Sequence, residues 1–431
     1  MPITSAAPGR QAVRLELPPK VLWIISAIGL MSGWWQLRTL MYKWQLHVDM
    51  EIYRAGARAF LANESLYAAP FSVADIKLPF IYPPFGALIL TPFVYLSDDL
   101  AATSMIMLSG VLTFLCSLLV ARALVPRGRH LEALAIACLV WPFSLLSEPI
   151  TLNASFGQIN VLIMALCVLD MVPRRRLLPV GTFIGIAAAI KLTPLVMCLY
   201  FLLRKDFRAI LTAGCSLLLV TSATALYRFQ DTKRFYTEMI FKMNSTKEAG
   251  VDTAYISNQS IKGMLARWAR SQGEAVAHQS IIDAIWLILS LLTIAGCAYL
   301  MREMIQRALL VDAALVNAAL MLLISPISWS HHWVWLPLFA MVLLYRWLTI
   351  PGHPMLLGIS AGIVSLFCLQ IKPMWYFGDL NSAAYSMGVW QKIVLSGYTW
   401  MAFAVLLSLH LVLRKQPLAV SDDQQESGRM S

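Results

Sequence analysis

The chain has 431 residues, of which 59% are hydrophobic and only 13% are charged, and its formal net charge is +11. A soluble domain of this length does not have such a composition, so we expect an all-α polytopic membrane protein. Its Lys and Arg residues lie in short clusters between apolar runs rather than along one face. They therefore act as topology signals and do not predict nucleic-acid binding.

The N-terminal segment carries Arg10, Arg14 and Lys20 ahead of an apolar run over 21–37. This pattern resembles a signal sequence, but no cleavage site with small residues follows it. We therefore predict that residues 1–20 are a cytoplasmic segment and that the apolar run is a retained first helix.

A bilayer crossing needs about 20 apolar residues. Runs that meet this description are found at 21–41, 100–124, 131–147, 157–172, 207–226, 279–301, 308–325, 332–348, 355–371 and 394–413. The stretch 178–203 contains Lys191 and Pro194 and is expected to form two short or broken helices. The stretch 84–97 is bracketed by prolines and is expected to be re-entrant or interfacial. About twelve crossings result.

This topology places the basic turns in the cytoplasm and the polar segments on the opposite side. The polar segments are 47–84, 148–158, 191–194, 227–278, 325–332 and 372–390. Because they gather on one face, we predict the active site on the outer (periplasmic) face of the plasma membrane. The predicted domains are the transmembrane catalytic domain 21–413 and a cytoplasmic, disordered tail at 414–431.

An acidic pair follows the first apolar run. Asp49 and Glu51 are two residues apart, so in a helix they point about 200° apart and cannot both face one ligand. A partly buried carboxylate near the bilayer can take a proton from a hydroxyl nucleophile. The alternative is an ordinary solvated charge.

Lys191 is the only strongly basic residue of its apolar stretch. A lone lysine at membrane depth is costly and indicates function, and its ammonium can neutralise a lipid phosphate. Snorkelling to the interface is the alternative.

His331 and His332 begin another apolar span. Adjacent histidines cannot share one helix face, so one imidazole facing a phosphate is more plausible than two facing a metal. The alternative is a pair of polar residues in an interfacial aromatic belt.

Amide side chains occur at Gln158 and Asn160 and again at Asn258 and Gln259, with aromatic residues nearby. Such amides bind sugar hydroxyls, but they also cap helices. The chain has no P-loop, no Rossmann glycine pattern, no HExxH and no nucleophile-elbow serine. An outward-facing enzyme has no nucleotide sugar, so an activated substrate has to arrive on a lipid.

The ordered set of motifs resembles the multi-spanning GT-C glycosyltransferases. The motifs are Asp49, Phe-Ile-Tyr-Pro-Pro (80–84), Gly-Gln-Ile-Asn (157–160), Ile-Lys-Leu-Thr-Pro (190–194), Asn-Gln-Ser (258–260) and Ser-Pro-Ile-Ser-Trp-Ser-His-His (325–332). The branch that this set resembles is the polyprenyl-phosphate-mannose-dependent α-(1→2)-mannosyltransferases of actinobacterial envelopes, which build phosphatidylinositol mannosides and lipomannan.

The resemblance implies a metal-independent, inverting transfer, without a cofactor, from a polyprenyl-phosphate-sugar donor to the hydroxyl of a lipid-linked glycan. It implies that Asp49 is the general base and that Lys191 with His331 or His332 holds the donor phosphate. Arg54 and Arg58 are candidates for the phosphate or an anionic acceptor. The implied sugar contacts are Tyr82, Gln158, Asn160, Asn258 and Gln259.

Two alternatives remain open from the sequence. A related arabinofuranosyltransferase would use the same base and phosphate contacts with polyprenyl-phosphate-arabinose. A lipid transporter or flippase would explain the broken stretch at 178–203, although no pair of inverted halves is evident.

Overall fold

The computed structural model describes residues 17–43, 47–73, 76–173, 176–242, 252–350, 352–369, 371–378 and 383–415. The protein is almost entirely helical over these residues. Their one sheet is a small antiparallel ribbon of β1 (Phe71–Val73) and β2 (Ile76–Leu78). The predicted cytoplasmic segment 1–20 and the predicted disordered tail 414–431 lie mostly outside the described residues.

Helices account for nearly all predicted spans, and short 3-10 or π turns (η) connect several of them. The first half of the chain contains α1 (Pro19–Tyr42), α2 (Val48–Leu61), α3 (Pro84–Leu90), η1 (Thr91–Tyr95), α4 (Asp98–Leu124), α5 (His130–Leu146), α6 (Glu148–Phe156), α7 (Asn160–Met171), α8 (Thr182–Ile190), η2 (Thr193–Met197) and α9 (Cys198–Leu203).

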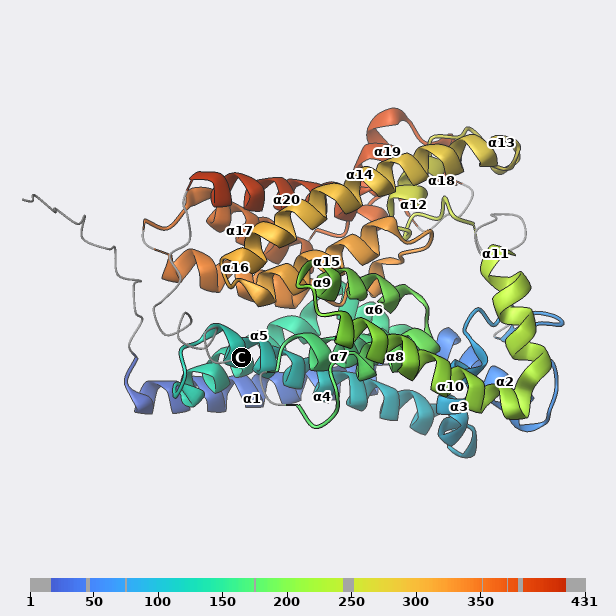
Figure 1. Cartoon of the computed structure of the whole chain (residues 1–431), viewed down its shortest axis with the longest axis horizontal. Helices are drawn as coiled ribbons and strands as arrows, with labels where there is room; N and C mark the ends of the chain where they lie inside the picture. The colour runs from blue at the N-terminus through green and yellow to red at the C-terminus, as the bar shows by residue number, and fades with distance from the viewer. Residues whose placement is uncertain are drawn as a thin grey trace, which may run out of the picture.

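The second half contains α10 (Phe207–Arg234), η3 (Phe235–Met239), α11 (Ile240–Lys242), α12 (Ile261–Ala266), α13 (Gln272–Ala277), α14 (Gln279–Gln306), α15 (Leu310–Ile324), η4 (Ser330–His332), α16 (Leu336–Thr349), α17 (Met355–Leu369), η5 (Pro373–Trp375), α18 (Ala383–Ser386), α19 (Val389–Leu395) and α20 (Gly397–Lys415). Helices of the first half lie along one long side of the molecule and α14–α20 lie along the other (Figure 1).

Four described helices, α4, α10 with its extension to Lys242, α14 and α20, are long and apolar enough to cross a bilayer. The pair α5 and α6, bent by 63° at their junction, adds a fifth if it counts as one broken span. These helices confirm a membrane protein. Helix α1, with 24 residues, is not among them, and the other predicted spans are apolar helices of 10–17 residues. The count of about twelve crossings therefore stays a prediction.

The break predicted in 178–203 is present. Helix α8 ends at Ile190, Lys191 is extended with φ −153° and ψ 125°, and the chain resumes as η2 and α9. Pro194 within η2 explains why α8 does not continue, since proline has no backbone donor and fits only the first turn of a helix. The stretch after Pro83 is likewise short, as α3 followed by η1.

The predicted end of the span that begins at 207 coincides with a kink in α10. We expected this span to end at 226, and non-helical backbone at Arg228 (φ −132°, ψ 51°) interrupts the helix there. A further helical stretch, which we did not predict, continues through Lys242. The charged residues after 226 are typical of a loop in the sequence. In the structure, Arg228 pairs with Asp231 and donates to the Phe60 carbonyl near the end of α2, while Asp231 accepts from the amide of Leu66, which ties this helix to the chain after α2.

Close helix packing rests on two glycines of α1 four residues apart. A Cβ on Gly29 would lie 2.3 Å from the carbonyl oxygen of Cys138, and one on Gly33 would lie 2.1 Å from the indole of Trp141. Small residues at this spacing let two helix backbones approach in a membrane. Helix α5 therefore packs directly against α1 and directs α6 toward the centre of the molecule.

Candidate active site

Seven of the predicted site residues converge on one cluster, although they come from separate parts of the chain. They are Asp49 in α2, Tyr82 before α3, Gln158 and Asn160 between α6 and α7, Lys191 in the break after α8, and His331 and His332 in η4. Side-chain hydrogen bonds join most of them, and His331 is reached through its backbone carbonyl, which accepts from Asn160 Nδ2 at 3.4 Å, and through a ring contact with His332.

A chain of hydrogen bonds runs across the cluster. The Tyr82 and Tyr53 hydroxyls are 2.8 Å apart, and the Tyr53 hydroxyl donates to Gln158 Oε1 at 2.7 Å. Asn160 Nδ2 donates to the same oxygen at 3.1 Å, and Asn160 Oδ1 accepts from Lys191 Nζ at 3.2 Å. Every member of this chain thus has a fixed orientation, which a site for directed chemistry requires.

These hydrogen bonds use the oxygen of Gln158 and leave its NH₂ group for another partner. Its oxygen accepts from Tyr53 and Asn160, so its NH₂ group is directed to Asp49, whose carboxylate it hydrogen-bonds. Burial raises the pKa of Asp49 from 3.8 to about 6, and the Gln158 hydrogen bond and the charge of Lys191 oppose that rise. A carboxylate with a pKa near 6 is ionised at neutral pH yet basic enough to share a proton with a hydroxyl.

Lys191 is held entirely by neutral groups. Besides Asn160, its ammonium meets His332 Nε2 at 3.2 Å and lies 5.5 Å from the centre of the Tyr82 ring. Within the described part of the chain, no carboxylate lies within ion-pair distance of Nζ, and Asp49 acts on it only at longer range. A buried cation without a paired anion is costly, so this position favours an anionic ligand.

His331 is a buried imidazole without a hydrogen-bond partner. Its side chain is 5% exposed, and among the described residues neither Nδ1 nor Nε2 has a partner. Its ring packs edge-on against Phe156 with centroids 5.2 Å apart. Burial, with a smaller effect of Lys191, lowers the pKa of His331 to about 3, so the ring is neutral and has one N–H to donate.

The turn that brings Gln158 to Asp49 depends on Gly157. This residue ends α6 in the left-handed region, with φ +66° and ψ 38°. A Cβ here would lie 2.7 Å from the Cβ of Met50, next to Asp49. Glycine therefore satisfies both the backbone conformation and the close approach of α6 to α2.

Two arginines hold α2, the helix that carries Asp49. Arg54 pairs with Asp98 and donates through Nε to the carbonyl of Phe93 at 3.0 Å. Arg228 pairs with Asp231 and donates to the Phe60 carbonyl at 3.2 Å, near the end of α2. Arg54 is thus occupied by the protein itself, away from the cluster.

Arg58 does not join the cluster either, because its side chain is exposed on the other face of α2.

The remaining two predicted sugar contacts, Asn258 and Gln259, also lie outside the cluster. Asn258 Nδ2 donates to the Thr253 and Pro326 carbonyls, and its oxygen accepts from the amide of Ser328 at 2.9 Å.

Gln259 is held in the same way by protein groups. Its amide nitrogen donates to the Ile256 and Leu395 carbonyls, and its oxygen accepts from the amide of Tyr398. Both amides therefore hold the segment before η4 in place, with Ser257 and Ser330 hydroxyls 3.0 Å apart. Direct sugar contact by Asn258 and Gln259 stays a prediction without support from this geometry.

Sequence reasoning missed two residues. Tyr53 joins Tyr82 to Gln158, and only its place one helical turn after Asp49 pointed to it. Glu148 is 1% exposed, and its carboxylate accepts from Trp375 Nε1 at 3.1 Å and from the Tyr398 hydroxyl at 2.8 Å. It also hydrogen-bonds Ser330, the neighbour of His331.

No group of three or more His, Cys, Asp or Glu side chains that could hold a metal occurs among the residues with described positions. Metal independence itself remains a prediction.

The fold and this cluster define a helical membrane protein in which an ionisable carboxylate and a lysine with neutral hydrogen-bond partners share one buried polar network. The sequence profile of glycosyltransferase family 87 matches residues 80–326. The chain belongs to this family and is a glycosyltransferase, which disfavours the transporter alternative.

Named relatives agree with this assignment. The chain is 31% identical over 90% of its length, and 89% of the relative, to the polyprenol-phosphate-mannose-dependent alpha-(1-2)-phosphatidylinositol mannoside mannosyltransferase of Mycobacterium tuberculosis. The protein of the same name from Mycolicibacterium smegmatis is 32% identical over 92% of this chain and 91% of its own.

A solved structure with detectable similarity is ArnT from Cupriavidus metallidurans bound to undecaprenyl phosphate. The alignment covers 92% of this chain and 79% of that one, with a TM-score of 0.37 and 14% identity. At this level neither fold detail nor function is carried over.

Proposed function

We propose that the protein transfers a mannosyl residue from polyprenyl-phosphate-mannose to a phosphatidylinositol mannoside or lipomannan acceptor, with inversion, to give an α-(1→2) linkage. The relatives that align over about nine-tenths of the chain bear names for this reaction. The observation that carries the proposal is the Lys191 ammonium, held by neutral partners in the same network as the Asp49 carboxylate.

In this mechanism Asp49 is the general base. The acceptor hydroxyl gives its proton to the Asp49 carboxylate while its oxygen attacks the anomeric carbon of the donor. The bond from that carbon to the phosphate oxygen breaks, and polyprenyl phosphate leaves with the electron pair. Attack from the face opposite the leaving phosphate converts a β-linked donor into an α-linked product.

The phosphate gains a negative charge as it leaves, going from a diester to a monoester. Lys191 offsets this charge, and the N–H of His331 is free to hydrogen-bond the phosphate oxygens. His332, which already meets Lys191, orients the ammonium. Tyr82, Gln158 and Asn160 belong to the same cluster as Asp49 and Lys191, and we propose that they contact the transferred sugar. Arg54, Asn258 and Gln259 hold neighbouring segments in place outside the cluster, and Arg58 is exposed on the other face of α2.

The finer architecture belongs to the proposal as well. We place the chain in a GT-C arrangement of about twelve crossings, with residues 21–413 as the catalytic domain and the cluster on the outer face of the plasma membrane. The donor then enters laterally from the bilayer beside the break at Lys191. The broken α8–η2 stretch supports this entry, since irregular backbone at membrane depth is tolerated where it lines a site.

The test is a transfer assay with purified protein in nanodiscs, polyprenyl-phosphate-mannose and a phosphatidylinositol mannoside, with and without a chelator. The proposal predicts a chelator-insensitive gain of one hexose on the acceptor by mass spectrometry. A pentose gain from polyprenyl-phosphate-arabinose, with no hexose gain, would instead establish the arabinofuranosyltransferase. Loss of activity with the chelator would refute metal independence.

A further inference from the structure

A cavity of about 430 Å³ lies beside the cluster and has no part in the mechanism above. Its lining combines charged, hydroxyl and apolar side chains: Leu40, Lys43, Glu148, Thr151, Leu152, Ser155, Phe156, Lys372 and Trp375. Its volume falls in the range of about 300–1,000 Å³ that is typical of small-molecule sites. Five of the lining residues belong to α6, which also positions Gln158.

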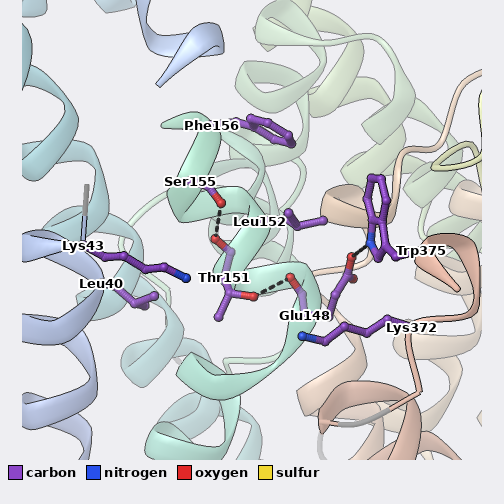
Figure 2. A pocket seen from close by; sticks show the side chains of 9 residues that line it. All are labelled: Leu40, Lys43, Glu148, Thr151, Leu152, Ser155, Phe156, Lys372 and Trp375. Carbon is purple, nitrogen blue, oxygen red and sulfur yellow. Dashed lines mark hydrogen bonds between the residues drawn. The ribbon is translucent and has the colours of Figure 1, made fainter. Parts of the chain in front are cut away.

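The charge of the cavity favours an anion. Figure 2 shows the Lys43 and Lys372 side chains extending toward α6 from opposite sides, with their ammonium groups leading. Neither ammonium forms an ion pair with another described residue, and Glu148 is the one carboxylate in the lining. Two ammonium groups against one carboxylate leave one positive charge, which a phosphodiester monoanion would neutralise.

The hydroxyl and carboxylate groups of the cavity favour a polyol. Thr151 and Ser155 donate their hydroxyl protons to carbonyls of α6, at 3.0 and 2.9 Å, so their oxygens remain as acceptors. Glu148 is fixed by Trp375 and Tyr398 and has further lone pairs to accept hydrogen bonds. These groups match a ring that carries several hydroxyls beside its phosphate.

The position of the cavity favours a lipid head group over a free phosphate. Lys43 directly follows α1, a helix of 24 residues, and Leu40 and Trp375 add apolar surface to the same cavity. Basic side chains at the end of a membrane helix lie at the depth of lipid phosphates. A phosphate held there stays attached to its acyl chains in the bilayer.

We propose that this cavity binds the phosphodiester-linked polyol head group of the acceptor lipid. The inference rests on the proposed function, because it assigns the acceptor of that reaction. Helix α6 spans from Glu148 in the cavity to the turn before Gln158, which is about 13 Å for nine residues.

The first experiment measures binding without catalysis. In the Asp49→Asn protein, short-chain phosphatidylinositol is titrated in detergent and followed by native mass spectrometry, with short-chain phosphatidylcholine as comparison. Adding Lys43→Gln and Lys372→Gln is expected to raise the Kd for phosphatidylinositol about tenfold or more, the usual effect of removing charged hydrogen bonds. Lys43→Arg with Lys372→Arg should retain binding, as should Lys20→Gln at the opposite end of α1.

The second experiment separates acceptor from donor in the active protein. The double glutamine variant should raise the KM for the acceptor and leave the KM for polyprenyl-phosphate-mannose unchanged. An unchanged Kd for phosphatidylinositol would overturn the inference, and so would a raised KM for the donor alone. Lysine-dependent phosphatidylinositol binding in a protein that transfers no mannose would support the inference while refuting the proposed function.

Discussion

Replacing Asp49 with asparagine should make the protein more stable as well as inactive. The substitution keeps the shape of the side chain, and its carbonyl oxygen can still accept from Gln158. It removes a carboxylate whose burial raises its pKa from 3.8 to about 6. The difference corresponds to at most about 3 kcal/mol of unfavourable free energy at neutral pH, an upper value because the side chain is only partly buried.

The pH dependence of this effect has a definite sign. A carboxyl group whose pKa is higher in the folded state binds more protons when folded, so stability falls as the pH rises from about 4 to about 6. Below this window both states are protonated and the penalty is absent, and above it the penalty is complete. The variant should therefore match the wild type near pH 4 and exceed it above pH 6.

The assay is thermal unfolding of both proteins in the same detergent over pH 4–8. Glu51→Gln is the matched control, since it removes a carboxylate from the same turn of α2 and should not reproduce the pattern. A lower Tm for the Asp49→Asn variant at pH 7, or a difference that does not change with pH, would refute the buried-carboxylate assignment.

Three further predictions test the proposed base, the phosphate contact of His331 and the support of α2 by Arg228. The kcat/KM of the wild type should fall about tenfold between pH 7 and pH 5, because protonation of a base with a pKa near 6 removes its function; a flat profile contradicts Asp49 as the base. His331→Ala should lower kcat about 10- to 100-fold without a comparable loss of stability, since the ring nitrogens of His331 bond no described protein group. A steady-state assay measures kcat, and a melting curve measures the stability. Arg228→Met should destabilise the protein by about 3–5 kcal/mol in chemical unfolding, because Asp231 loses its buried partner, and a loss below 1 kcal/mol would refute the pairing.

The sequence allowed much of the site to be predicted because its chemistry is carried by rare residues. A lysine inside an apolar stretch and a carboxylate after the first span are each unusual enough to indicate function. Both lie in the cluster, and the backbone breaks next to Lys191 as its neighbouring proline predicts. The resemblance of the ordered motifs gave the family, which the profile match confirms.

The remaining features depend on pairings between distant segments, and local patterns do not contain them. Asn258 has the residue type of a sugar contact, but the backbone of residues 253–328 uses its hydrogen bonds. Glu148 is satisfied by Trp375 and Tyr398, which lie more than two hundred residues further along the chain. The extension of α10 depends on Arg228 reaching the end of α2, so charge density alone predicted a loop there.

The central claim is that Asp49 accepts the proton of the attacking hydroxyl while Lys191 receives the leaving phosphate. Its most direct test compares mannosyl transfer from polyprenyl-phosphate-mannose by the wild type and Asp49→Asn, with acceptor and donor binding measured on the same samples. The account predicts that transfer by the variant falls by at least about 100-fold while both substrates still bind. Near-normal turnover by a folded Asp49→Asn protein would contradict it.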